Sequence, residues 1–267
     1  MGKNKERDDF GNRMKGYEKE ETNRKLDITQ PVYIRLDGHR FSKFTRGLKK
    51  PYDRIIMDSM IETAKYILEQ TDAIIAYTQS DEISLLYTEP NIPFSGKIQK
   101  INSIIPALTA VKFMSLIISY ELKDRLPHFD SRTINLPSKE EATNMILWRC
   151  MDAKKNAIQA TAQQYFSHKK LHQKSQKDML QMLADIDIDW NDPIQYPDKF
   201  KYGTFIQKRP IKKILTEQEF NEIPEQHRPE SKEVIRHQPQ IINMPAFNTV
   251  KNRIEIIFNN QEPVVIS

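Results

Sequence analysis

The chain has 267 residues and a net charge of +5 at pH 7, which suits one large domain, alone or with an appendage, and favours a polyanionic partner. Its single cysteine, Cys150, excludes an intrachain disulfide framework and a cysteine-rich zinc site. The N-terminal residues lack the apolar core of a secretion signal, and Pro106 and Lys112 interrupt the most apolar stretch, Ile104 to Tyr120. We therefore expect a soluble, cytoplasmic protein with no membrane partner.

The first part of the chain alternates predicted strands and helices. Residues 1–30 are mostly charged and have no clear period, which indicates a solvated helix or an arm. Pro31 to Asp37 is β-rich and mostly apolar, which predicts a buried strand. Asp53 is the predicted N-cap of a helix whose apolar residues recur at helical spacing. Ala73–Thr78 and Ile83–Thr88 predict two strands that a short turn joins into a hairpin.

A further helix, from about Ile101 to Leu122, and a strand within Pro127–Pro137 follow the hairpin. The order strand, helix, strand, strand, helix, strand is typical of the ferredoxin-like βαββαβ fold, the core that polymerase palms and nucleotide cyclases share. The sequence therefore predicts an α/β (α+β) protein with this palm-like core. Ser138 is predicted to open another helix, which runs to about Phe166, with Glu141 completing a capping box.

The remainder of the chain is harder to assign. Asp187–Tyr202 is rich in Asp, Pro and aromatic residues and indicates irregular structure. The last segment, Thr204–Ser267, contains several prolines and late pieces such as Arg253–Phe258 (RIEIIF) that look like strands. We expect three parts: a charged N-terminal arm or helix (1–30), a palm-like catalytic core (31–137), and a helical and C-terminal extension packed on the core (138–267).

Two carboxylates, Asp37 and Asp81, are expected to meet at one edge of the sheet. Asp37 ends the first predicted strand, Asp81 lies in the hairpin turn, and a right-handed crossover places that strand beside the hairpin. Neighbouring carboxylates repel unless a cation lies between them, and Mg²⁺ prefers such oxygen ligands. Gly38 would let its carbonyl approach the same ion. Each aspartate alone is an ordinary turn residue, but the two together favour a metal site.

The surroundings of this pair could bind a triphosphate. The stretch from Gly38 to Ser42 leaves backbone N–H groups free at a strand end. Nearby cations are Arg40, Lys43, Arg46, Lys49 and Lys50, although a solvated basic loop would also explain them. Ser80 could donate to a phosphate oxygen or merely cap its turn. Alternation places Glu82 on the opposite face from Asp81, so we assign it a supporting role.

Five motifs, in order from Arg35 to Asn156, resemble those of the tRNA(His) guanylyltransferase family: RLDGHRFSKF, KKPYD, AYTQSDEISLLY, FDSR and LWRCMDAKKNAIQ. A later segment, Lys199–Phe205 (KFKYGTF), is similar to another pattern of the family. The resemblance implies a nucleotidyltransferase that adds nucleotides to the 5′ end of tRNA, at the acceptor stem, in the 3′-to-5′ direction. It also implies nucleoside triphosphate substrates, activation of the 5′ end by ATP or GTP, and a homotetramer.

Carried over by motif, the resemblance implies that Asp37, the Gly38 carbonyl and Asp81 hold two Mg²⁺ ions and that the two aspartates are catalytic. It places Lys50 and Asp53 near the activating nucleotide. The nucleotide-binding residues that it implies are Asp37, Gly38, His39, Arg40, Phe41, Ser42, Lys50, Asp53, Ser80 and Asp81.

The sequence departs from the family pattern at a few positions. Lys154 stands where members that read the histidine anticodon have His, His39 replaces the usual Arg after Asp-Gly, and Cys150 replaces a Gln. The segment around these helix residues is more similar to the bacterial and phage guanylyltransferase-like branch. That branch favours template-directed repair of truncated tRNA 5′ ends, in which pairing with the opposite strand selects the nucleotide.

A polar stripe follows the same predicted helix. Arg149, Asp152, Asn156 and Gln163 recur at helical spacing. With the neighbouring Lys154, the first three are candidate contacts to RNA or nucleotide, and a solvated face or a buried ion pair that positions the helix is the alternative. The pair His168 and His172 has the spacing of a zinc site but no third ligand, so we expect a surface segment there.

Two other functions remain open for a palm-like chain with a carboxylate pair. A nucleotide cyclase or dinucleotide synthase would use the same fold and metals but would need nucleotides alone. A non-catalytic RNA-binding protein would bind tRNA without turnover, although the carboxylate pair argues against it.

Overall fold

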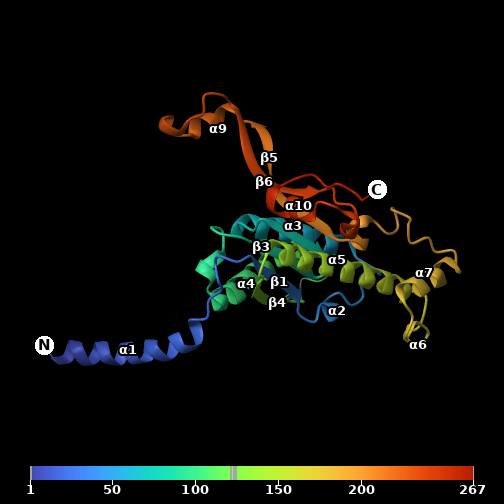
Figure 1. The fold of residues 1–267 in the computed structure, drawn as a ribbon, viewed down its shortest axis with the longest axis horizontal. Coiled ribbons are helices and arrows are strands. Elements are labelled where there is room, and N and C mark those ends of the chain that lie inside the picture. The colour runs from blue at the N-terminus through green and yellow to red at the C-terminus, as the bar shows by residue number, and fades with distance from the viewer. Residues whose placement is uncertain (1, 121, 123–124, 267) are drawn as a thin grey trace.

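The computed structural model describes residues 2–120, 122 and 125–266, and it contains a six-stranded sheet with helices on both faces (Figure 1). Neighbouring strands are antiparallel throughout, in the order β4-β1-β3-β2-β5-β6. The strands are β1 (Val32–Gly38), β2 (Ile75–Gln79), β3 (Glu82–Tyr87), β4 (Phe129–Asn135), β5 (Thr204–Ile214) and β6 (Glu233–Ile242).

The α-helices are α1 (Gly2–Thr22), α2 (Phe41–Phe44), α3 (Arg54–Thr71), α4 (Ile98–Ile117), α5 (Lys139–Ala162), α6 (His168–Leu171), α7 (Gln176–Ala184), α8 (Asp198–Lys201), α9 (Glu217–Glu222) and α10 (Arg253–Asn259). Short 3₁₀ helices are η1 (Pro93–Gly96), η2 (Glu225–His227) and η3 (Phe247–Thr249).

Alternation along β1 separates the two layers of the core. Ile34 and Leu36 pack with α3 and α4 on one face, whereas Tyr33 packs with α5 and α10 on the other. The elements β1, α3, β2, β3, α4 and β4 follow one another as βαββαβ, and their strands lie in the order β4-β1-β3-β2. The predicted ferredoxin-like α+β fold is therefore confirmed, and β5 and β6 extend its sheet.

Helix α3 illustrates how a local signal sets an element. The Asp53 side chain accepts hydrogen bonds from the backbone N–H groups of Ile55 and Ile56, which confirms the predicted N-cap. The helix then buries Met60 and Ile67 against the sheet. It ends at Asp72, which adopts the left-handed conformation.

Three sequence-based expectations need correction. Arg253–Phe258 forms helix α10 instead of a strand, because Ile256 and Ile257 are consecutive yet both buried, which a strand with one buried face does not allow. Only half of the predicted capping box forms: Ser138 accepts from the Glu141 N–H, but the Glu141 side chain accepts from Asn144. Helix α4 ends at Ile117, and the rest of the helix predicted there includes residue 121, which lies outside the described residues.

Helix α4 is, within the described part of the chain, the one helix long and apolar enough to cross a membrane by length and composition. Its residues Ile101, Ile105 and Phe113 are buried in the core beneath the sheet. The core helix of a soluble protein meets the same criterion, so this helix is weak support for a membrane span.

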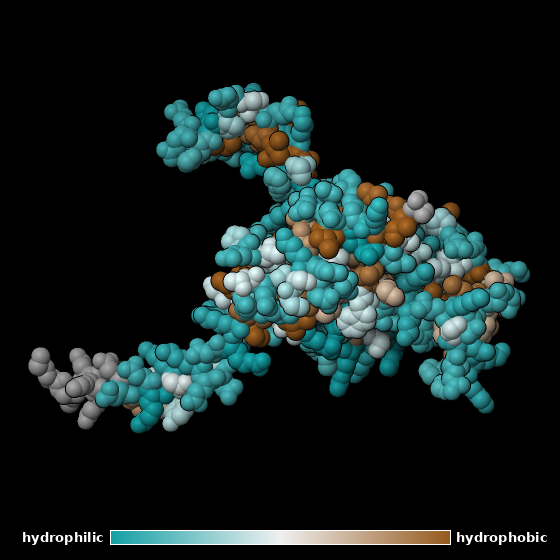
Figure 2. All heavy atoms as spheres, in the orientation of Figure 1, coloured by the Kyte–Doolittle hydropathy of each residue, from teal (hydrophilic) through white to brown (hydrophobic). Residues whose placement is uncertain are grey.

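Two elongated elements project from the body (Figure 1). Helix α1 extends away at the N-terminal end, and the paired strands β5 and β6 continue beyond the sheet as an arm that carries α9. Apolar side chains lie along this arm (Figure 2), among them the exposed Ile214 and Ile235. The proposed division at residues 30 and 137 stays a prediction.

Candidate active site

Asp37 and Asp81 lie side by side at one end of the sheet. Asp37, the last residue but one of β1, stands directly opposite Glu82 of β3, and Asp81 occupies the turn just before Glu82. The Asp81 carbonyl accepts a hydrogen bond of 3.1 Å from the Gly38 N–H. A Cβ on Gly38 would stand 2.9 Å from the Asp81 Cβ, so only glycine permits this approach. The fold thus brings together two carboxylates that are distant in the sequence.

The two carboxylates affect each other's ionisation. Burial, followed by the negative charge of Asp37, raises the pKa of Asp81 to about 6. The negative charge of the two neighbouring carboxylates and their hard oxygen donors fit Mg²⁺. This ion needs only one or two carboxylates besides water and phosphate. No group of three or more His, Cys, Asp or Glu side chains could hold a metal ion in the part of the chain that the structure describes. The metal-binding role of Asp37, Gly38 and Asp81 stays a prediction.

The raised pKa of Asp81 predicts a pH dependence of stability in the metal-free protein. The folded state binds this proton more tightly than the unfolded state, where the pKa is near 3.8. The free energy of unfolding should therefore fall as the pH rises from about 4 through about 6. Asp81→Asn removes the charge and should flatten this part of the profile. Urea denaturation in EDTA checks this, and parallel profiles for the two proteins would contradict it.

A cavity of about 330 Å³ opens beside the carboxylate pair, which is within the range of small-molecule sites. Its walls come from β1, the segment between β1 and α3, the β2–β3 hairpin, α3, α5 and α8. Met57, Met60 and Phe200 give it an apolar part, while Lys50 and Lys199 add positive charge. This combination of apolar surface, cations and adjacent carboxylates can accommodate a nucleoside triphosphate with its metal.

The turn from Gly38 to Ser42 lies largely outside this cavity, whereas Thr45 and residues 48–53 line it. Gly38, His39, Arg40 and Ser42 are not part of the lining, and the last three are exposed. Phe41 lines the cavity, but its ring belongs to the buried aromatic cluster that also contains Phe44, Phe113 and Phe129. The side chain of Phe41 is therefore held by the core.

The predicted backbone cradle for a phosphate is shorter than the sequence suggests. The N–H groups of Arg40, Phe41 and Ser42 make no hydrogen bond to any described residue. The N–H of His39, in contrast, donates to the His128 carbonyl at 2.9 Å. Three backbone donors near the carboxylates thus remain available for an anion.

Lys50, Asp53 and Ser80 line the cavity together with the carboxylate pair. The Asp53 carboxylate already caps α3 and also accepts a hydrogen bond of 2.9 Å from the Tyr120 hydroxyl. Lys50 makes no ion pair with any described residue, so its ammonium group is available to a ligand. Of the two residues expected near an activating nucleotide, Lys50 is thus the better placed to bind it.

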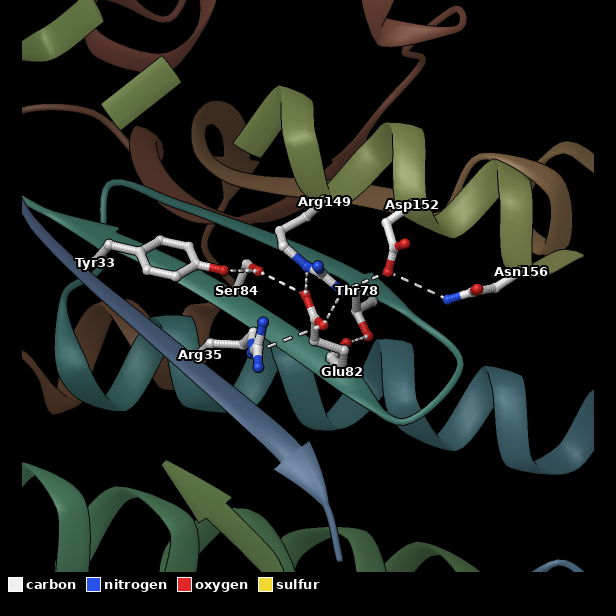
Figure 3. Close-up of polar contacts among 8 residues, drawn as sticks. All are labelled: Tyr33, Arg35, Thr78, Glu82, Ser84, Arg149, Asp152 and Asn156. Carbon is white, nitrogen blue, oxygen red and sulfur yellow. Dashed lines mark hydrogen bonds and ion pairs between the residues drawn. The ribbon is translucent and has the colours of Figure 1, made fainter. Parts of the chain in front are cut away.

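Arg149 of α5 reaches down to Glu82 on the sheet (Figure 3). Its Nε and Nη2 donate to the two Glu82 carboxylate oxygens at 2.8 and 2.6 Å, and Nη2 also donates to Asp152 at 3.0 Å. Asn156 donates to Asp152 and lines the cavity. Part of the polar stripe is therefore a buried ion pair that fixes α5 on the sheet, and Glu82 has the supporting position expected for it.

Other residues singled out in the sequence lie away from the cavity. Lys154 places its Nζ 6.0 Å from the centre of the Tyr202 ring and lines a separate hollow. Gln163 is exposed at the C-terminal end of α5. His168 and His172 are also exposed, and no metal cluster among the described residues includes them.

Two features of the site are not among those predicted from the sequence. Asp130 of β4 stands directly opposite Asp37, and the antiparallel pairing expected for the first and last strands of this fold could have indicated it. Across the cavity, Tyr52 stacks on Phe200 with ring centroids 4.7 Å apart. Nothing local in the sequence links these two rings, because only the folded chain brings α8 beside the loop before α3.

Known proteins resemble this chain over much of its length. The family model of tRNA(His) guanylyltransferase matches residues 11–137. An uncharacterized protein of Acanthamoeba polyphaga mimivirus is 29% identical over 232 residues, which cover 76% of this chain and 78% of that protein. The tRNA(His) guanylyltransferase of Candida glabrata is 28% identical over 140 residues, which cover 49% of this chain and 59% of the yeast protein.

Two solved structures of bacterial tRNA(His) guanylyltransferase-like proteins share the fold. The protein in complex with ATP is 35% identical, with a TM-score of 0.69, and the match covers 75% of this chain and 89% of that chain. The protein in complex with GTP is 28% identical, with a TM-score of 0.70, and the match covers 94% of this chain and 99% of that chain. The chain belongs to the tRNA(His) guanylyltransferase family.

Proposed function

We propose that the chain is a nucleotidyltransferase that extends the 5′ end of tRNA in the 3′-to-5′ direction. The observation that carries the proposal is the convergence of Asp37 and Asp81 beside a cavity of nucleotide size. Membership of the family supports the transfer of nucleotides to tRNA. The bacterial relatives solved with ATP and with GTP support both nucleotides as ligands.

In the proposed reaction, the 3′-hydroxyl of the incoming nucleoside triphosphate attacks the 5′-terminal phosphorus of the tRNA. A new oxygen–phosphorus bond forms, the bond from that phosphorus to pyrophosphate or AMP breaks, and the hydroxyl proton passes to water. Asp37, the Gly38 carbonyl and Asp81 would hold two Mg²⁺ ions. When bound, Mg²⁺ lowers the pKa of an attacking hydroxyl and neutralises charge on a leaving phosphate.

The residues of the chain orient both reactants. The free N–H groups of Arg40, Phe41 and Ser42 and the Lys50 ammonium donate to phosphate oxygens. We further propose that the base opposite the missing position selects the nucleotide. This choice is supported by Lys154, which stands where members that read the histidine anticodon have His.

The proposal is tested with tRNAs that lack their first nucleotide. Each is incubated with Mg²⁺ and single nucleoside triphosphates while the base opposite the missing position is varied. We expect the incorporated nucleotide to follow Watson–Crick pairing with that base. Addition of guanosine regardless of the opposing base would contradict selection of the nucleotide by the template. Products formed from nucleotides without RNA would indicate a cyclase or dinucleotide synthase instead.

A further inference from the structure

Two rows of opposite charge cross one face of the sheet. Residues directly opposite one another in antiparallel strands project from the same face. Asp37 stands between Asp130 of β4 and Glu82 of β3, so carboxylates form the first row. Two residues back along β1, Arg35 stands directly opposite Arg132 of β4. The two rows are about 7 Å apart, because a strand rises about 3.4 Å per residue.

Arg35 is almost buried and poorly paired. Its side chain is 12% exposed, and its buried Nε has no hydrogen-bond partner. The nearest carboxylate, that of Glu82, lies 3.9 Å from this Nε and gives both its oxygens to Arg149 (Figure 3). Burial of a guanidinium without hydrogen bonds is costly, so this position favours an added anion.

Arg132 faces solvent on the edge strand β4. It makes no ion pair or hydrogen bond with any described residue, including the exposed Asp130 two residues away on the same face. Like charges directly opposite one another destabilise a strand pair. Arg35 and Arg132 are therefore unfavourable neighbours unless an anion lies between them.

We propose that Arg35 and Arg132 together bind a backbone phosphate of the RNA strand whose 5′ end lies at the carboxylate row. Guanidinium groups match the geometry of phosphate oxygens and bind them through paired hydrogen bonds. The inference rests on the proposed function, since it takes RNA as the second substrate. It assigns to this RNA an arginine pair of which Arg35 borders the nucleotide cavity and Arg132 lies outside it.

The position of Arg132 distinguishes this phosphate from those of the nucleotide. Arg35 lines the nucleotide cavity, which lies on the β3 side of β1. Arg132 is not part of that lining and lies on the other side of β1, on the free edge of the sheet. A large ligand can approach a free edge, whereas the cavity has the size of a small molecule.

The test measures RNA binding in the absence of turnover. The probe is a 5′-phosphorylated RNA hairpin that copies a tRNA acceptor stem without its first nucleotide, titrated without divalent cations at several salt concentrations. We expect Arg132→Gln to weaken binding about tenfold at low salt and to reduce the slope of log affinity against log salt by about one. The control is Lys100→Gln, which removes one exposed positive charge from α4 on the opposite face and should match the wild type.

A second variant and a second ligand test whether Arg132 binds RNA and not the nucleotide. Arg132→Lys, which keeps the charge but not the paired hydrogen bonds, should keep the salt slope and lose only part of the affinity. ATP affinity without RNA should be unchanged in Arg132→Gln, and a loss confined to ATP would overturn the assignment to RNA. RNA binding by Arg132→Gln equal to that of Lys100→Gln would overturn the site itself.

The outcome is independent of catalysis. Thermal unfolding of Arg132→Gln should not occur earlier than that of the wild type, because the substitution removes a like-charge contact. A wild-type protein that bound the hairpin but added no nucleotide would refute the proposed function, while the effect of Arg132 on RNA binding would stand.

Discussion

Asp81→Asn and Asp37→Asn are each expected to lower the rate of nucleotide addition by about a thousandfold. Each substitution removes a carboxylate from the pair that would hold the metal at the reacting phosphate, and metal stabilisation of transition-state charge is worth several kcal/mol. A loss of about 4 kcal/mol corresponds to this factor, since each 1.36 kcal/mol is tenfold. Single-turnover incorporation into a truncated tRNA measures the effect.

The control is Asp185→Asn, the same substitution at an exposed residue where α7 ends. It should keep the wild-type rate. The Asp37 and Asp81 variants should also keep wild-type RNA affinity and resist unfolding at least as well as the wild type in EDTA, because they relieve a repulsion. A variant of either aspartate that retained a tenth of the wild-type rate would contradict the assignment.

Arg149→Met is expected to lower the free energy of unfolding by about 3 kcal/mol, the cost of leaving a buried charge without its partner. Glu82 is only 13% exposed and would lose the cation that binds both its carboxylate oxygens. Arg35 could replace that cation only in part, since its Nε is 3.9 Å away. Nucleotide addition should also slow, because Glu82 directly follows Asp81. Urea denaturation measures the change in stability.

A double-mutant cycle isolates the ion pair from other effects. The double variant Glu82→Gln, Arg149→Met should lose less stability than the sum of the two single losses. The difference should be about 1 kcal/mol or more. Lys155→Met, which removes an exposed cation from the same helix, should change stability by no more than about 0.5 kcal/mol. Strict additivity of the Glu82 and Arg149 changes would show that the pair does not hold α5 on the sheet.

The sequence predicts the fold well where a local signal and the tertiary environment agree. The β-rich, mostly apolar run from Pro31 to Asp37 forms β1 to within one residue at each end, and Asp53 caps α3 through its own side chain. Prediction from the sequence fails at Arg253–Phe258, where β-branched residues suggest a strand. Ile256 and Ile257 both need burial, and the helical face of α10 against α5 provides it. Tertiary packing thus overrides a weak local preference.

The candidate site shows the same contrast between what local sequence predicts and what tertiary packing decides. Asp37 and Asp81 could be paired from the sequence, because βαββαβ topology fixes which strand ends meet. The contacts of Glu82 with Arg149, and of Tyr52 with Phe200, depend on how helices α5 and α8 settle over the sheet and the cavity. Such packing distances are set by side chains from many segments. A pattern read along one strand or helix therefore does not contain them.

The most direct test of the carboxylate pair is metal binding itself. Mn²⁺ in place of Mg²⁺ can be titrated by electron paramagnetic resonance in the presence of a non-hydrolysable ATP analogue. We expect the wild-type protein to bind the metal–nucleotide complex. Asp37→Asn and Asp81→Asn should bind it at least about tenfold more weakly, because each variant lacks one charged ligand. Equal binding by all three proteins would contradict the claim that these two aspartates hold the metal.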